Sequence, residues 1–179
     1  MPGKSQTTEN KPIIKHSGRT SNGKEYLMLL DRTFTEKQNE EQFQILTSKL
    51  FPSTIFVFGS NLAGRHGAGA AKYAMQHYGA KYGVGYGLTG QAYALPTKDW
   101  DIDTLPLSAI QVFVYAFIGF ARHHPELHFL ITRIGCGLAG YKDLEIAPMF
   151  IGSPTNCHFY EEWKNWLPKQ SVLGPSPRS

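Results

Sequence analysis

The stretch Thr-Ile-Phe-Val-Phe-Gly-Ser-Asn-Leu-Ala-Gly-Arg-His-Gly-Ala-Gly-Ala-Ala, residues 54–71, decides the fold of this chain. Its first five residues are a continuous apolar run of β-branched and aromatic side chains ending at Gly59, which is typical of a strand buried on both faces. A glycine-rich loop follows, and the segment from Ala70 to His77 then predicts a helix that Gly79 ends. A strand, a glycine loop and a helix in this order place backbone N–H groups and a helix N-terminus where an anion can approach them.

A second loop of the same kind occupies residues 135–141, with the sequence Gly-Cys-Gly-Leu-Ala-Gly-Tyr. It follows another apolar run, from His128 to Ile134, which predicts a second buried strand. Glycines at strand ends let backbone N–H groups approach an anion closely, because no side chain stands in the way. The two loops together predict a cradle for a phosphorylated ligand.

The remaining apolar segments alternate between strand and helix patterns. Strands are predicted over residues 24–31, 91–95 and 156–160, and helices over residues 40–50 and 108–124, with Pro96 ending the strand before it. This alternation indicates an α/β fold, a mixed sheet with helices on both faces, in which ligands gather at strand ends. We expect one domain over residues 24–168, a disordered basic arm over residues 1–23 and a disordered tail over residues 169–179.

The composition is that of a folded protein. Hydrophobic residues make up 41% of the chain and aromatic residues 13%, which argues against general disorder. The net charge is +4, and several positive charges lie in the first two dozen residues, where apolar residues are scarce. We interpret this arm as a solvated tail rather than a nucleic-acid contact, because no basic stripe with interleaved aromatic residues follows it.

Cysteine usage and hydropathy predict a cytoplasmic protein with no membrane partner. Cys136 and Cys157 are too few for a disulfide framework, which fits a reducing cytosol. The N-terminus lacks a basic region followed by an apolar stretch, so no secretory signal is visible. The most apolar segment, residues 105–121, contains Pro106 and Gln111 and predicts a buried helix rather than a membrane span. No metal is expected, because the histidines lack metal-ligand spacing.

Both glycine loops carry a resemblance to a known family. Residues 58–71 resemble the macrodomain signature, in which a strand ends in an asparagine and is followed by a leucine-containing turn, a run of glycines and a helix. Residues 131–138, Ile-Thr-Arg-Ile-Gly-Cys-Gly-Leu, resemble the second macrodomain signature and are especially similar to the branch that removes ADP-ribose from protein carboxylates or DNA bases. The resemblance covers residues 54–150. It implies a three-layer macrodomain-like fold, ADP-ribose or a closely related nucleotide as ligand, no cofactor, and a phage or bacterial origin.

The resemblance also assigns binding roles. It implies that Gly67, Ala68 and Gly69 lie beside the distal ribose, where small side chains permit a close approach. Asn61 matches the family asparagine, whose amide can bond a ribose hydroxyl, although the same side chain can instead bond the backbone at the strand end. The loop that surrounds the diphosphate is matched by Gly135, Cys136, Gly137, Leu138 and Ala139. The N–H groups of that loop are expected to point at phosphate oxygens.

Several neighbouring residues have weaker assignments. Tyr141 either stacks on the ligand or packs behind the loop, and we expect it to pack. Cys136 is not expected to be a nucleophile, because the matching family cysteine is not one and no activating histidine can be placed. Asp31 matches the aspartate that many macrodomains place after their first strand to accept from the adenine amino group. Arg65 and His66 could contact phosphate or a polymer attached to ADP-ribose, but as exposed loop residues they are expected to be solvated.

Lys98 and Asp99 are the candidate reactive pair. In the related hydrolase branch, a lysine at the end of a strand between the two loops attacks the anomeric carbon of the ribose, and Lys98 matches it. A lysine can do this only when its pKa is lowered by burial or nearby positive charge, and the alternative is a surface lysine paired with Asp99. The branch also uses an aspartate after the leucine of the second loop, where this chain has Ala139. That departure removes a proton-transferring group, and Asp99 is the candidate substitute.

These observations lead to hypotheses from different functional classes. The first is a hydrolase that removes ADP-ribose from a modified protein or DNA. The second is a non-catalytic module that senses or sequesters an ADP-ribose-type nucleotide, and Ala139 supports it. The third, a nucleic-acid binder that uses its basic arm, has little support in the folded part.

Overall fold

The computed structural model describes residues 12–19, 25–31, 54–168 and 171–172, and the helix expected over residues 40–50 lies outside them. The elements in chain order are β1 (Pro12–Arg19), β2 (Glu25–Asp31), β3 (Thr54–Asn61), α2 (Gly69–His77), β4 (Gly87–Thr89), β5 (Ala92–Lys98), α3 (Leu107–His123), β6 (His128–Ile131), α4 (Asp143–Ile146), η1 (Ala147–Phe150), β7 (Cys157–Phe159), η2 (Glu161–Trp163) and β8 (Ser171–Val172).

Six strands form one mixed sheet in the order β4-β5-β3-β6-β7-β8. All neighbouring pairs are parallel except β4 and β5, which are antiparallel. The apolar run that begins at Thr54 becomes the central strand β3, flanked on both sides by hydrogen-bonded neighbours. A strand in that position is buried along its length, which is why the run is apolar without alternation.

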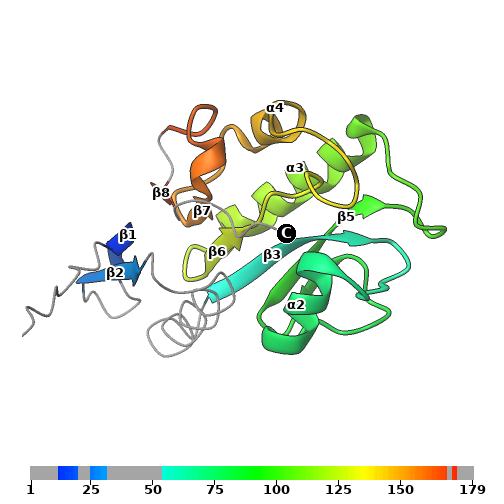
Figure 1. The fold of residues 1–179 in the computed structure, drawn as a ribbon, viewed down its shortest axis with the longest axis horizontal. Coiled ribbons are helices and arrows are strands. Elements are labelled where there is room, and N and C mark those ends of the chain that lie inside the picture. The colour runs from blue at the N-terminus through cyan, green and yellow to red at the C-terminus, as the bar shows by residue number, and fades with distance from the viewer. Residues whose placement is uncertain (1–11, 20–24, 32–53, 169–170, 173–179) are drawn as a thin grey trace, which may run out of the picture.

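The two faces of β3 are covered by different helices, so the fold has three layers (Figure 1). Ile55 and Val57 belong to the core cluster that α3 completes, whereas Phe56 and Phe58 belong to a second cluster with residues of α2. Successive side chains of a strand point to opposite faces, so this division follows directly from the sequence of β3. The expectation of an α/β fold with a mixed sheet and helices on both faces is confirmed.

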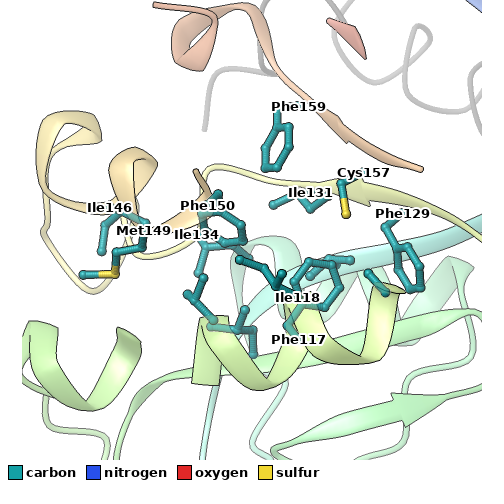
Figure 2. Close-up of a cluster of buried hydrophobic side chains, with 14 of the residues drawn as sticks. Phe117, Ile118, Phe129, Ile131, Ile134, Ile146, Met149, Phe150, Cys157 and Phe159 are labelled. Atoms are coloured by element: carbon teal, nitrogen blue, oxygen red, sulfur yellow. The ribbon is translucent and has the colours of Figure 1, made fainter. Parts of the chain in front are cut away.

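The larger core cluster lies between α3, the middle of the sheet and the α4–η1 segment. Figure 2 shows Phe117 of α3, Phe129 of β6 and Phe150 of η1 with their side chains directed toward one another. Phe117 and Phe129 meet edge to face with ring centroids 5.3 Å apart. Burying a side chain of this size contributes about 2 kcal/mol relative to leaving it exposed. This packing fixes the face of the sheet against which the second glycine loop lies.

Two strand ends differ from the sequence prediction. β5 does not stop at Pro96 but continues to Lys98, because β4 pairs with β5 only as far as Ala94, so Pro96 has no ladder donor to supply on that side. β6 ends at Ile131, three residues earlier than expected. Thr132 already turns away there, with its N–H and its hydroxyl both donating to the Val57 carbonyl.

Short strands lie in both segments that were expected to be disordered. β1 pairs with β2 in an antiparallel two-stranded sheet, and the boundary expected between residues 23 and 24 falls between these strands. At the other end, β8 adds two residues to the six-stranded sheet beside β7. None of the helices in the described ranges has the length and apolar character needed to cross a membrane.

Candidate functional site

Three strand ends meet at one edge of the sheet. β5, β3 and β6 are adjacent and parallel, so their carboxyl ends lie side by side. β5 ends at Lys98, β3 ends at Asn61 before the first glycine loop, and β6 leads into the second glycine loop. Open α/β sheets bind ligands at this kind of edge.

The two glycine loops approach each other above that edge. A β-carbon built on Gly59 would lie 3.6 Å from the backbone nitrogen of Gly135. Farther along both loops, a β-carbon on Gly69 would lie 3.8 Å from Cδ1 of Leu138. The second loop therefore lies close to the end of β3 and to the first turn of α2.

The first loop is held in shape by Asn61. Its Nδ2 donates to the Arg65 carbonyl at 2.8 Å, and its Oδ1 accepts from the Arg65 N–H at 2.9 Å. Of the two roles considered for Asn61, the structure shows the bond to the backbone at the strand end. The bond to a ribose hydroxyl stays a prediction.

A glycine-rich segment behind the first loop supports it at very short range. Gly64 has φ +67°, and a β-carbon there would lie 2.3 Å from the Gly83 carbonyl carbon, so only glycine fits. The Gly83 N–H donates to the Gly64 carbonyl at 2.8 Å, and the Ser60 hydroxyl donates to the Gly85 carbonyl. The backbone of the first loop therefore packs directly against the backbone of residues 83–85, which cannot move aside as a side chain can.

His66 was expected to be solvated, and this expectation is wrong. Its side chain is fully buried, edge-on to Phe58, and Nε2 lies 3.1 Å from the Val84 carbonyl. A carbonyl only accepts, so Nε2 carries the proton in that contact. The ring therefore joins the first loop to the segment behind it, while Arg65 is exposed.

Backbone N–H groups without a partner among the described residues occur in the second loop, and the N-terminus of α2 lacks a side-chain cap. Helix α2 begins with no side-chain cap at Ala68 and no acidic residue in its first turn. On the second loop, the N–H groups of Gly137, Leu138 and Ala139 donate no hydrogen bond within the described part of the chain. An uncapped helix N-terminus and a run of free N–H groups both favour an anion.

The second loop is braced by an ion pair that joins it to η2. Arg133 donates from Nε to Oδ1 of Asp143 at 2.9 Å and from Nη2 to Oδ2 at 2.5 Å, and the buried Trp163 indole donates to the same carboxylate at 2.6 Å. Burial alone would raise the pKa of the Asp143 carboxyl, but the hydrogen bonds from Arg133 and Trp163 hold that pKa below its ordinary value. The same carboxylate raises the pKa of Arg133.

Two further bonds tie the second loop to the segment that follows β5. The Tyr141 hydroxyl donates to the Leu105 carbonyl at 2.7 Å, and the ring packs against the main core cluster. The Thr104 hydroxyl donates to the Ala139 carbonyl at 3.2 Å. Tyr141 thus packs behind its loop, and stacking on a ligand stays an untested alternative.

Cys136 lies in surroundings that suppress a thiolate. Burial, together with the neighbouring Asp143 carboxylate, raises the pKa of its thiol to about 12. Its Sγ lies 3.6 Å from the Ile134 carbonyl, and its backbone N–H donates to Arg133. This environment agrees with the expectation that Cys136 is not a nucleophile.

Lys98 and Asp99 stand at the tip of β5 without pairing to each other. Oδ1 of Asp99 accepts the N–H groups of Asp101 and Asp103, each at 2.9 Å, while its Oδ2 accepts none from the described residues. Lys98 is partly buried and forms no ion pair in the described ranges. The alternative of a surface ion pair between them is therefore not what the structure contains.

The remaining expected residues fall as follows. Gly67, Ala68 and Gly69 are exposed at the end of the first loop, as are Gly137 and Leu138 on the second. Asp31 is the last residue of β2, in the two-stranded sheet, and its adenine role stays a prediction. Within the described ranges, no group of three or more His, Cys, Asp or Glu side chains could hold a metal ion.

Sequence reasoning missed the brace around Asp143 and the hairpin that follows Lys98. Arg133 and Trp163, which both bind Asp143, are far apart in sequence, and no local sequence pattern predicts that they share this partner. The hairpin did leave a signal, because Asp99, Asp101 and Asp103 alternate around Trp100 and Ile102. Aspartates at such spacing often accept backbone N–H groups in turns.

Comparisons with known proteins yield a structural alignment but no match in sequence. No protein-family profile matches the chain, and no curated protein matches it in sequence. A solved structure described as the macrodomain of Mycobacterium tuberculosis DarG aligns with a TM-score of 0.47 and 16% identity, over 71% of this chain and 91% of that one. A superposition this loose carries no argument about function.

Proposed function

We propose that the chain is a macrodomain-like protein that binds ADP-ribose, or a closely related nucleotide, with the diphosphate between its two glycine loops. One observation carries the proposal: the N-terminus of α2 has no side-chain cap, it lies close to the second loop, since a β-carbon built on Gly69 would be 3.8 Å from Cδ1 of Leu138, and the N–H groups of residues 137–139 in that loop have no partner among the described residues. Such groups bind phosphate oxygens, because they supply donors and positive partial charge without a side chain in the way. The signature-like wording of both loops supports ADP-ribose as the nucleotide.

The proposed placement of the ligand follows from the loops. The diphosphate lies against the backbone of residues 135–139, and the distal ribose lies beside Gly67, Ala68 and Gly69. Asn61 contributes by holding the first loop open, with its remaining N–H free to reach a ribose hydroxyl. Asp31 is proposed for the adenine amino group. Both described cysteines are free thiols, which suits the proposed reducing cytoplasm.

Hydrolysis of ADP-ribose from a modified protein or DNA is the catalytic form of this proposal. Nζ of Lys98 attacks the anomeric carbon of the distal ribose, the bond from that carbon to the target breaks, and its electron pair leaves with the target. We assign the proton transfer to Oδ2 of Asp99, which takes the proton that Nζ loses and passes it to the departing target, since Oδ1 already accepts two backbone N–H groups. Water then releases ADP-ribose from the lysine adduct. The second candidate is a binding module without chemistry, and it is favoured by Ala139, whose methyl group cannot transfer a proton.

Calorimetric titration with ADP-ribose, NAD and ATP tests the binding proposal. A β-carbon on Gly137 meets nothing within 4 Å, and its φ is not in the left-handed region, so Gly137→Glu is expected to fold while placing a carboxylate among the phosphate donors. We expect this variant to lose about 100-fold or more in affinity for ADP-ribose, because two or three charge-assisted hydrogen bonds are at stake.

Gly119→Glu is the matched control. Gly119 lies in α3, away from both loops, and a β-carbon there also meets nothing within 4 Å. Its affinity for ADP-ribose should equal that of the wild type. No heat with any of the three nucleotides, or normal binding by Gly137→Glu, would remove the second loop as a phosphate site.

A further inference from the structure

The hairpin that follows β5 is held in a single shape by its own backbone. We call residues 99–103 the rim hairpin. Its base is an antiparallel bridge between Lys98 and Thr104, and the Asp99 N–H donates to the Asp103 carbonyl at 2.8 Å. The Asp99 carboxylate adds two more bonds from inside the turn. Ile102 has φ +71°, the single non-glycine residue with positive φ in the described part of the chain. The Ile102 N–H also donates to the Asp99 carbonyl at 3.4 Å, and the four internal hydrogen bonds together hold this conformation in place.

This rigid hairpin displays a tryptophan to solvent. Trp100 is 66% exposed, whereas Trp163 is 1% exposed and Trp166 is half-buried in the core. An indole is the largest apolar side chain and is enriched at recognition surfaces, where its flat face stacks on a partner. A ring presented on an immobilised turn loses little conformational entropy when it binds.

Two exposed carboxylates lie in the same short turn as Trp100. Asp101 and Asp103 are both exposed, and neither forms an ion pair with a described residue. With Asp99 they account for three of the 14 acidic residues of a chain whose net charge is +4. The local charge of the rim hairpin is thus opposite to that of the whole protein. Nearby carboxylates attract cations and repel phosphates at close range.

The rim hairpin stands beside the proposed ADP-ribose site. The hydroxyl of Thr104, at the base of the hairpin, donates to the Ala139 carbonyl of the second glycine loop. Lys98, the last residue of β5, comes directly before the hairpin. Figure 1 shows the green segment after β5 projecting beyond the sheet, at the edge to which β3 and β5 run. If the distal ribose lies at Lys98, as proposed, the protein or DNA attached to that ribose would lie next to Trp100.

We propose that the rim hairpin recognises a cationic side chain, arginine or lysine, of a protein segment that carries the ADP-ribose, a proposal that rests on the proposed function. The guanidinium or ammonium group lies over the Trp100 ring and pairs with the carboxylates of Asp101 and Asp103. Aromatic faces attract such cations, and carboxylates beside the ring strengthen the attraction. A polynucleotide is disfavoured, because its phosphates would meet two uncompensated carboxylates.

Fluorescence anisotropy of labelled unmodified probes tests the hairpin without relying on ADP-ribose. The probes are an arginine-rich decapeptide, a glutamate-rich decapeptide and a thymidine decanucleotide. We expect the arginine-rich peptide to bind best, and Trp100→Ala and Asp101→Asn/Asp103→Asn each to weaken it by roughly 3- to 10-fold. Asp99 is left intact, since it shapes the turn. Tyr115→Ala, which removes another exposed aromatic ring from α3, is the matched control and should bind like the wild type.

The second arm compares an arginine-rich peptide carrying ADP-ribose with free ADP-ribose. The peptide-linked ligand should bind more tightly than the free nucleotide, and Trp100→Ala should reduce that advantage by the same roughly 3- to 10-fold. If neither form of ADP-ribose binds but the unmodified peptide still depends on Trp100, the proposed function fails and the hairpin proposal stands. If the arginine-rich peptide binds Trp100→Ala as well as it binds the wild type, or if the oligonucleotide is the Trp100-dependent probe, the hairpin proposal is overturned.

Discussion

Gly69 and Leu138 lie close together across the two glycine loops, since a β-carbon built at position 69 would be 3.8 Å from Cδ1 of Leu138. Gly69 is also the first residue of α2 and has φ +54°, in the left-handed region. Gly69 is thus the residue at which α2 begins and the chain changes direction. Its lack of a side chain also leaves space for Leu138 of the second loop. The site depends on glycine here for its backbone conformation and for its missing side chain at once.

Replacing Gly69 by alanine should therefore cost stability and affinity together. We expect a loss of about 1 kcal/mol in the free energy of unfolding, because an L-residue at this φ is strained. Affinity for ADP-ribose should fall as well, since the first turn of α2 shifts. Gly67→Ala is the control for stability only, because Gly67 lacks a positive φ and a β-carbon there meets nothing within 4 Å, whereas its place beside the proposed ribose makes it unsuitable as a control for affinity. Urea unfolding of both variants and calorimetry of Gly69→Ala check this, and equal stability of the two would show that φ at Gly69 imposes no strain.

The brace around Asp143 should appear as a pH-dependent part of the stability. Hydrogen bonds from Arg133 and Trp163 lower the pKa of this carboxyl in the folded protein. A carboxyl with a lowered folded pKa stabilises the fold fully above its unfolded pKa, which is about 4, and loses this contribution as the pH falls through the folded value. Asp143→Asn is expected to lose about 1–2 kcal/mol at pH 7, because a charge-assisted pair becomes a neutral bond.

The measurement for Asp143 is urea unfolding of wild type and Asp143→Asn at pH 7 and at pH 3. The difference between the two proteins should be largest at pH 7 and should shrink at pH 3, which lies below the unfolded pKa of about 4, so that the Asp143 carboxyl of the unfolded chain is mostly protonated. A difference that stays constant with pH would mean that the brace works through shape rather than charge. Glu161→Gln, which touches an exposed ion pair with Lys164, should show almost no effect at either pH.

The thiols should be unreactive in the folded protein. Burial raises the pKa of Cys136 to about 12, with a contribution from Asp143, and burial raises that of Cys157 to about 12 as well. At pH 7.5 only about one thiol in 10,000 or fewer is ionised at such a pKa, so alkylation by iodoacetamide is slow. Mass spectrometry should show labelling only after urea is added. Rapid labelling of Cys136 in the native protein would reopen its role as a nucleophile.

Much of the fold was readable in the sequence because its decisive signals are local. The apolar run at Thr54 predicted the central strand, and the pattern over residues 108–124 predicted α3 to within a residue at either end. Pro96 misled the prediction, because proline in a strand is compatible with a side of the ladder that has no partner. Sequence shows the proline but not which neighbour a strand lacks.

The site was only partly readable, since its geometry depends on long-range contacts. Both glycine loops were visible, and their convergence follows from placing β3 and β6 side by side. The burial of His66 was not visible, because it depends on Val84 and Phe58 closing over the ring. Neither was the exposure of Trp100, since a tryptophan ordinarily indicates core and only the closed turn around it forces the ring outward.

Asp99 allows the structural and the chemical roles of one carboxylate to be separated. Asp99→Asn keeps an oxygen that accepts the Asp101 and Asp103 N–H groups, so the rim hairpin should survive, but it removes the group proposed to carry the proton. Asp99→Ala removes both functions and should also lower stability by about 1 kcal/mol. If the protein is a hydrolase, release of ADP-ribose from a modified protein should fall about 100-fold in Asp99→Asn with binding unchanged, and should vanish in Lys98→Ala. If Asp99→Asn releases ADP-ribose at the wild-type rate, Asp99 only shapes the turn. If Lys98→Ala releases ADP-ribose at the wild-type rate, Lys98 is not the nucleophile. Binding without release by any of the proteins, including the wild type, would identify the module without chemistry that Ala139 favours.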